Sequence, residues 1–228
     1  MIGPTNDPTT GATTGATSAP TASPTDVRAR ASLRATVPWL LLGAAWLAVV
    51  AGGMHRLWRY SSDPGPGAAA PAEWPAASRI GRAPGRATLV MFAHPHCPCS
   101  RASVGELGWL MAHYGPQLDA HVLVLRAPGT APGWEEGDIG RLAADVPGVR
   151  VEIDAGGVEA ARFGAKTSGQ VLLYDAGGRL LFSGGITGGR GHPGDNLGRA
   201  RVVSLLTTGT ADRADSPVFG CALEDSKP

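Results

Sequence analysis

Residues 88–100 read TLVMFAHPHCPCS, an apolar run that passes directly into two closely spaced cysteines. The uncharged run from Thr88 to Ala93 is typical of a strand buried on both faces. The cysteines flank Pro98, and proline is well suited to the first turn of a helix. Apolar residues then recur at helical spacing as far as Tyr114, where a Gly-Pro pair ends the pattern. The segment therefore predicts a strand, a cysteine-bearing turn and a helix.

Further along the chain, short apolar runs alternate with helical patterns. Strands are predicted at 121–125, 149–153, 170–174 and 179–183, and helices at 134–146, 158–163 and 196–207. Strands that alternate with helices pair in parallel, and the final two strands form a hairpin that adds antiparallel pairing. This order predicts a compact three-layer α/β domain with a central mixed sheet over residues 86–208.

These features together resemble the thioredoxin-like superfamily. Residues 151–187, from VEID to GGIT, are similar to the second half of the thioredoxin-like domains of membrane-tethered thiol–disulfide proteins. The CPC motif within HPHCPCSRAS (94–103), with the later GGIT and RGH segments, resembles the bacterial TlpA/RedB-like group. The resemblance implies a thioredoxin-like fold and thiol–disulfide chemistry.

Two positions depart from the family pattern. The family has Cys-x-x-Cys, whereas this chain has Cys97-Pro98-Cys99. Gly169, after Ser168, stands where the family has a cis-proline that faces the cysteines. These departures argue against an ordinary thioredoxin reductant. An alternative alignment places Cys99 at the family's second cysteine and leaves His96 at the nucleophile position.

A cysteine at a helix N-terminus meets unpaired N–H groups and the positive end of the helix dipole, which favour the thiolate. We therefore predict that Cys97 is the nucleophile and that Cys99 resolves the mixed disulfide. His94, His96 and Arg101 are expected to add positive charge nearby. The predicted supporting residues are Pro98, His96, Arg101, Ser168, Gly169, Arg190, His192 and Cys221.

Two later segments are expected to reach the cysteines. The glycine-rich loop 184–196 follows a strand that should end at the cysteine edge, so it should present Arg190 and His192 there. The C-terminal tail, residues 209–228, is long enough to bring Cys221 back to the site. The alternatives are a flexible surface loop and a stray buried thiol.

Residues 35–54 form an uncharged stretch long enough to cross a hydrocarbon core of about 30 Å. We predict a single uncleaved transmembrane anchor in the cytoplasmic (inner) membrane, with a cleaved signal peptide as the alternative. Residues 1–34 are predicted to be a disordered cytoplasmic tail, and 55–85 a semi-extended Pro/Ala/Gly-rich linker. Arginines that precede the anchor, and the cysteines beyond it, favour a periplasmic or other extracytoplasmic C-terminal domain.

Three functional hypotheses follow. The first is a thiol–disulfide oxidoreductase without a cofactor, whose partner is a protein disulfide or dithiol outside the membrane. The second is a carrier of copper or another soft metal that uses Cys97, Cys99, His192 and Cys221. The third is a non-catalytic thioredoxin-fold binding module. The net charge of +1 and the lack of a basic motif argue against nucleic acid as a partner.

Overall fold

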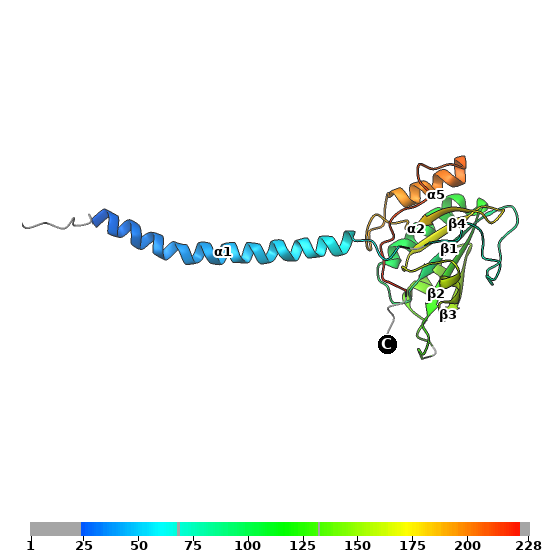
Figure 1. Ribbon diagram of the computed structural model, residues 1–228, viewed down its shortest axis with the longest axis horizontal. Helices are drawn as coiled ribbons and strands as arrows, with labels where there is room; N and C mark the ends of the chain where they lie inside the picture. Colours follow the sequence, from blue (N-terminus) through cyan, green and yellow to red (C-terminus); the bar gives the residue numbers. More distant parts are fainter. Residues whose placement is uncertain (1–23, 68, 132, 224–228) are drawn as a thin grey trace, which may run out of the picture. The chain divides into compact units, whose positions relative to one another are not determined.

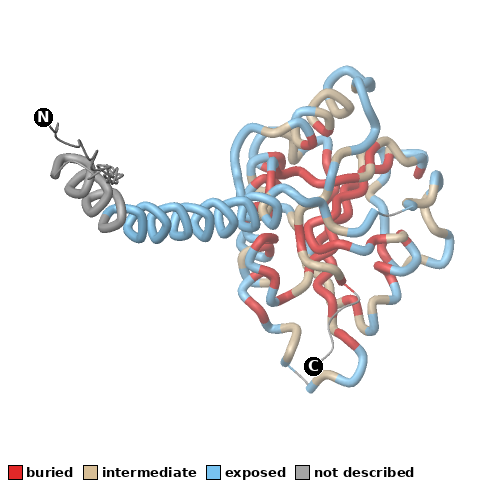
Figure 2. The backbone as a smooth tube through the Cα atoms, turned by 60° about the vertical axis from the view of Figure 1, so that its left-hand side comes forward, coloured by how far each residue is buried: buried red, intermediate tan, exposed pale blue. Residues whose placement is uncertain are grey.

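The computed structural model describes residues 24–67, 69–131 and 133–223. The first element is α1 (Pro24–Ser62), a helix that contains the apolar stretch Thr36–Ser62 (Figure 1). Within the described residues this is the one helix long and apolar enough to cross a membrane. Its side chains from residue 36 to residue 60 are exposed, which for such an apolar surface fits a lipid environment (Figure 2).

The C-terminal domain is built on one five-stranded mixed sheet in the order β3-β2-β1-β4-β5 (Figure 1). Its strands are β1 (Ala87–Ala93), β2 (Leu118–Arg126), β3 (Val149–Ala155), β4 (Gln170–Tyr174) and β5 (Leu180–Gly184). Strand β1 pairs in parallel with β2 and antiparallel with β4. This is the thioredoxin-like fold predicted from the sequence.

The helices are α2 (Ser100–Tyr114), α3 (Asp138–Ala144), α4 (Val158–Arg162) and α5 (Leu197–Thr208), with a 3-10 turn at Gly115–Gln117. Alternate residues of β1 enter two separate cores, because side chains along a strand point to opposite faces. Leu89, Met91 and Ala93 pack with α2, α3 and α5. Val90 and Phe92 pack with α4 on the other face. The buried residues gather along the sheet between these layers (Figure 2).

Two helices differ from their predicted limits. The helix expected over 134–146 begins at Asp138, because Gly137 is extended and passes so close to the Pro95 carbonyl that a Cβ would collide with it. Helix α1 begins at Pro24, so the expected disorder is absent over residues 24–34; residues 1–23 lie outside the described residues. Alanine, leucine and arginine continue a helix readily beyond its apolar window.

The segment expected to be a linker packs on the domain instead of standing free of it. The Trp74 ring meets the rings of Phe163 and Tyr174 edge-on, at centroid distances of 5.0 and 5.1 Å. The Trp74 backbone N–H donates to the Gly178 carbonyl at 2.7 Å, and Ile80 is buried in the same core. The packing of Trp74 and Ile80, together with hydrogen bonds such as that from the Leu180 N–H to the Ala72 carbonyl, thus attaches this Pro/Ala/Gly-rich segment.

Candidate functional site

The candidate site lies where β1 ends and α2 begins. The chain turns tightly there: the Cys97 N–H donates to the His94 carbonyl, and the Ser100 N–H donates to the Cys97 carbonyl, both at 3.1 Å. Cys99 is the N-cap of α2, with helical backbone angles. The predicted position of both cysteines at a helix start therefore agrees with the structure.

Cys97 lies beside Cys221 of the C-terminal tail. Their sulfur atoms are 3.1 Å apart, and Cys97 is 1% exposed. Burial opposes ionisation, but hydrogen bonds from Ser100 and Cys221 outweigh it and lower the pKa of Cys97 to about 7. Burial and the neighbouring Cys97 raise the pKa of Cys221 to about 12. At neutral pH roughly half of Cys97 is therefore thiolate, while Cys221 stays a thiol that can donate to it.

A chain of hydroxyl groups leads to the Cys97 sulfur. The Ser100 and Ser168 oxygens are 2.6 Å apart, and the Ser168 oxygen also accepts from the His94 N–H at 2.7 Å. The Ser100 side chain hydrogen-bonds Cys97, and because a thiolate can only accept, the Ser100 hydroxyl is the donor. Ser168 then donates to Ser100. Ser168 was predicted as a supporting residue, whereas Ser100 was not.

Cys99 has a different environment. Burial and the nearby Cys97 raise its pKa, and Arg190 opposes this rise. The Arg190 guanidinium also donates to the Gly220 carbonyl, next to Cys221 in the tail. The glycine-rich loop thus brings Arg190 to the cysteines, as the topology predicted, and Arg190 connects Cys99 with the tail.

The residues expected to add positive charge beside Cys97 have other partners. Burial and the neighbouring His96 lower the pKa of His94, so this imidazole is neutral at neutral pH. The His96 ring bonds the Trp134 carbonyl at 2.9 Å, and Arg101 pairs with Asp138 at 3.3 Å. Hydrogen bonds, more than neighbouring cations, thus favour the Cys97 thiolate. Pro98 lies between the cysteines in the wound turn, and its carbonyl accepts from the Arg101 N–H at 3.4 Å.

His192 lies on the same loop as Arg190 but turns away. Its Nδ1 is 2.8 Å from the Arg190 carbonyl, and it lines a separate surface hollow with Pro193 and Asp195. The loop is well anchored, since the buried Glu106 carboxylate of α2 accepts from the Gly194 N–H and from Arg199 at 2.5 Å each. A charged residue at a core-facing position of α2 was the sequence signal for this contact.

Gly169 has a conformation that explains why proline is absent. Its φ is 87°, in the left-handed region that favours glycine, and a Cβ there would lie 2.7 Å from the Ser103 hydroxyl. Its N–H donates to the Phe92 carbonyl at 2.7 Å, a bond that proline cannot make. Gly169 therefore joins the end of β1 to the Ser168 turn.

A cleft of about 390 Å³ opens beside Cys97. Cys97 is the one cysteine in its wall, which also includes Arg101, Glu136 and Asp138. Cys97 contributes to this wall although the residue as a whole is only 1% exposed.

Among the described residues, no group of three or more His, Cys, Asp or Glu side chains has the arrangement of a metal site. The soft-metal hypothesis, with Cys97, Cys99, Cys221 and His192 as ligands, stays a prediction. The sulfur atoms of the three cysteines lie close together, but the His192 ring bonds the Arg190 carbonyl instead.

Comparisons with known proteins bear on the fold. No protein-family model matches the chain, and no curated protein matches it. A hypothetical protein from Sinorhizobium meliloti is similar, with a TM-score of 0.51 and 23% identity over 61% of this chain and 80% of its own. An uncharacterized conserved protein from Geobacillus kaustophilus has a TM-score of 0.52 and 18% identity over 72% and 92%. Both share the fold.

A secreted Mycobacterium tuberculosis disulfide oxidoreductase homologous to E. coli DsbE is more distant. Its TM-score is 0.39, with 17% identity over 55% of this chain and 83% of its own. This similarity is too low to support an inference.

Proposed function

We propose that this chain is a membrane-tethered thiol–disulfide oxidoreductase in which Cys97 is the attacking group. The observation that supports this most is the Cys97 sulfur, with its pKa lowered to about 7 and a second thiol 3.1 Å away. A thiolate attacks a disulfide, and a neighbouring thiol releases the mixed disulfide that results. A binding module with vestigial cysteines would not need these hydroxyl and thiol donors around Cys97.

We propose that α1 anchors the chain as a single span in the cytoplasmic membrane and that the C-terminal domain faces outward. Arg28, Arg30 and Arg34 precede the apolar stretch, and Arg56 and Arg59 follow it. The excess of arginine before the span favours an inner N-terminus. On the outer side, a protein disulfide or dithiol is the natural partner, since disulfides persist in oxidising compartments.

The proposal is tested by the reduction of insulin disulfides by the full chain in detergent micelles, with dithiothreitol as the reductant. Cys97→Ser should lower the rate at least about 100-fold, because loss of a covalent nucleophile removes the first chemical step. His113→Gln, at an exposed position near the far end of α2, is the control and should keep the full rate. Equal rates for Cys97→Ser and the full chain would refute the proposal.

A further inference from the structure

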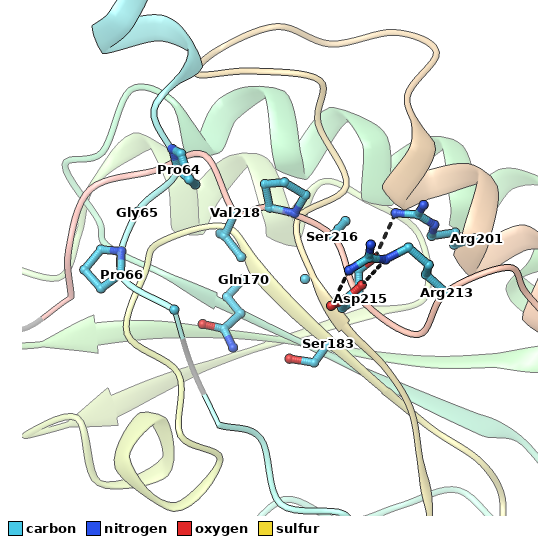
Figure 3. A pocket seen from close by; sticks show the side chains of 13 residues that line it. Pro64, Gly65, Pro66, Gln170, Ser183, Arg201, Arg213, Asp215, Ser216 and Val218 are labelled. Atoms are coloured by element: carbon cyan, nitrogen blue, oxygen red, sulfur yellow. Dashed lines mark hydrogen bonds and ion pairs between the residues drawn. The ribbon is translucent and has the colours of Figure 1, made fainter.

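The C-terminal tail is held against the site along most of its length. The tail lies along β5. The Ser183 N–H donates to the Ala214 carbonyl at 2.9 Å, and the Ser216 hydroxyl donates to the Gly185 carbonyl at 2.6 Å. Asp215 lies between Arg201 and Arg213, whose side chains donate to it at 2.8 Å each (Figure 3). The tail is therefore an ordered part of the domain before it reaches the cysteines.

The last part of the tail pairs with the turn that supports Cys97. The Ser168 N–H donates to the Cys221 carbonyl at 2.8 Å, and the Leu223 N–H donates to the Lys166 carbonyl at 2.9 Å. Gly220 approaches the Ser168 carbonyl so closely that a Cβ at 220 would collide with it. Main-chain bonds at Cys221 and Leu223 thus fix the backbone that carries the Cys221 side chain.

Cys99 is less well placed to bond with Cys97. The turn that carries both residues is already wound, with the Ala102 N–H donating to the Cys99 carbonyl at 3.2 Å. The Cys99 thiol also hydrogen-bonds the Cys97 sulfur, but a disulfide between residues only two apart closes a tight, strained ring. A Cys97–Cys99 disulfide would require this turn to unwind, whereas Cys221 needs to approach Cys97 by only about 1 Å to reach bonding distance.

We propose that Cys221, rather than Cys99, is the resolving cysteine, and that tail residues 213–223 form part of the active site. The inference rests on the proposed function and assigns the second thiol of its reaction. Cys97 contributes to the wall of the cleft, whereas Cys221 and Cys99 do not, so we expect the partner disulfide to approach Cys97 from this side. Cys221 then attacks Cys97 from the tail.

The reaction has two balanced steps. The Cys97 thiolate attacks the partner disulfide, whose S–S bond breaks; one partner sulfur bonds to Cys97, and the other leaves as a thiolate that takes up a proton. Cys221 then loses its proton and attacks the Cys97 sulfur, which breaks the mixed disulfide and releases the second partner thiolate. Two electrons pass to the partner, which is reduced, while Cys97 and Cys221 are oxidised to a disulfide. A dithiol reductant restores the starting state.

The test is a single turnover of the reduced full chain with an equimolar protein disulfide, followed by acid quenching, alkylation and mass spectrometry. Cys221→Ser should accumulate the Cys97 mixed disulfide and resolve it at least about 100-fold more slowly than the unmodified chain, because an adjacent intramolecular thiol has a high effective concentration. Cys99→Ser is the matched control and should resolve at the rate of the unmodified chain. A mixed disulfide trapped by Cys99→Ser, but resolved normally by Cys221→Ser, would overturn the inference.

Two further measurements keep the result decisive if Cys221→Ser does not fold. In the unmodified chain the oxidised product should be the Cys97–Cys221 peptide pair, and a Cys97–Cys99 pair would overturn the inference. Gly220→Ala, which pushes the tail off Ser168, should slow resolution, whereas Gly81→Ala, in open space, should not. If both glycine variants resolved the mixed disulfide at the same rate, this result would also contradict the assignment of Cys221 as the resolving cysteine. If no variant with Cys97 forms a mixed disulfide, the proposed function itself fails.

Discussion

Ser100 and Ser168 provide the hydroxyl chain that ends at the Cys97 sulfur. Ser100→Ala removes the hydroxyl that donates to the thiolate and leaves the backbone N–H in place. We expect the pKa of Cys97 to rise, and a rise of about one unit would reduce alkylation by iodoacetamide at neutral pH about fivefold. The measurement is the alkylation rate of Cys97 against pH. Ser204→Ala, on α5, is the control, and an unchanged profile for Ser100→Ala would contradict this role.

Gly169 offers a second test at the residue scale. Gly169→Pro should destabilise the domain, because proline cannot adopt a φ of 87° and has no N–H for the Phe92 carbonyl. We expect a loss of about 3 kcal/mol or more in the free energy of unfolding, measured in urea. A variant of unchanged stability would show that the Gly169 conformation is not required.

Cys97, Ser168 and Gly169 were identified from the sequence because the resemblance to the thioredoxin-like superfamily marks their positions. The charge environment was not predictable in the same way. His94, His96 and Arg101 are adjacent to Cys97 in sequence, yet their side chains bond elsewhere or stay neutral. The role of Ser100 depends on its hydrogen bonds to Cys97 and Ser168, and the contact with Ser168, from a distant segment, leaves no local pattern.

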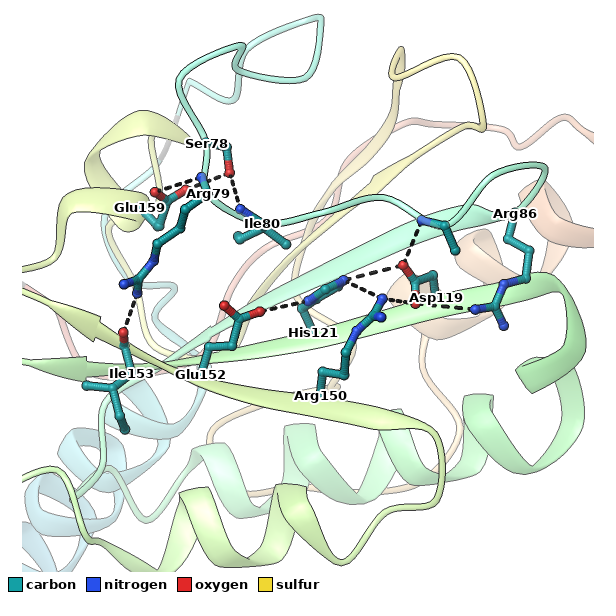
Figure 4. A network of polar contacts seen from close by, with 11 residues as sticks. Ser78, Arg79, Ile80, Arg86, Asp119, His121, Arg150, Glu152, Ile153 and Glu159 are labelled. Atoms are coloured by element: carbon teal, nitrogen blue, oxygen red, sulfur yellow. Dashed lines mark hydrogen bonds and ion pairs between the residues drawn. The ribbon is translucent and has the colours of Figure 1, made fainter.

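At the scale of elements, a polar network holds the strand ends opposite the cysteines. His121 lies between Glu152 and Asp119, at 3.1 and 3.4 Å, in the buried part of β2 (Figure 4). Asp119 also accepts from the Ala83 N–H at 3.0 Å and pairs with the side chain of Arg150. The network joins β2 and β3 to the segment that leads into β1.

We expect Asp119→Ala to lower the free energy of unfolding by about 2–4 kcal/mol, because its removal leaves His121 and a backbone N–H without their buried partner. Cys97 lies at the opposite end of β1, so its alkylation rate should not change. The measurements are urea unfolding and Cys97 alkylation. Asp63→Asn, at an exposed ion pair, serves as the control and should leave stability unchanged. A large change in Cys97 reactivity would indicate that the network reaches the site.

The strands were predictable from the sequence because their apolar runs are long and uninterrupted. The observed β1, β4 and β5 lie within one residue of their predicted limits. The start of helix α3 was not predictable, because it depends on Gly137 passing close to the Pro95 carbonyl. That contact joins residues far apart in the chain, and hydrophobic periodicity does not report it.

At the scale of the C-terminal domain, the segments on either side of the α/β core pack on it. Trp74 attaches the segment that precedes β1, and the Gly65 N–H donates to the Val218 carbonyl of the tail at 2.8 Å. Trp74→Ala should lower the free energy of unfolding by about 2–3 kcal/mol, through lost ring packing on Phe163 and Tyr174. Urea unfolding tests this, with the exposed Leu197→Ala as the control. Equal stabilities would mean that this segment is a free spacer after all.

The sequence showed that the tail is long enough to reach the cysteines, but not that it does so. Its route depends on main-chain hydrogen bonds to Ser168 and Lys166, which any residue can make and which carry no sequence signature. The close approach of Gly220 is the one local signal, and a single glycine in a glycine-rich chain has no predictive weight.

The most direct measurement is the pH dependence of iodoacetamide alkylation at each of the three cysteines of the full chain, resolved by peptide mass spectrometry. Thiolates react and thiols do not, so a lowered pKa moves the onset of reaction to lower pH. Cys97 should react with a midpoint of about pH 7, while Cys221, with a pKa of about 12, should stay unmodified until strongly alkaline pH. A common midpoint for all three cysteines, or Cys97 as the slowest of them, would contradict the assignment of Cys97 as the reactive thiolate.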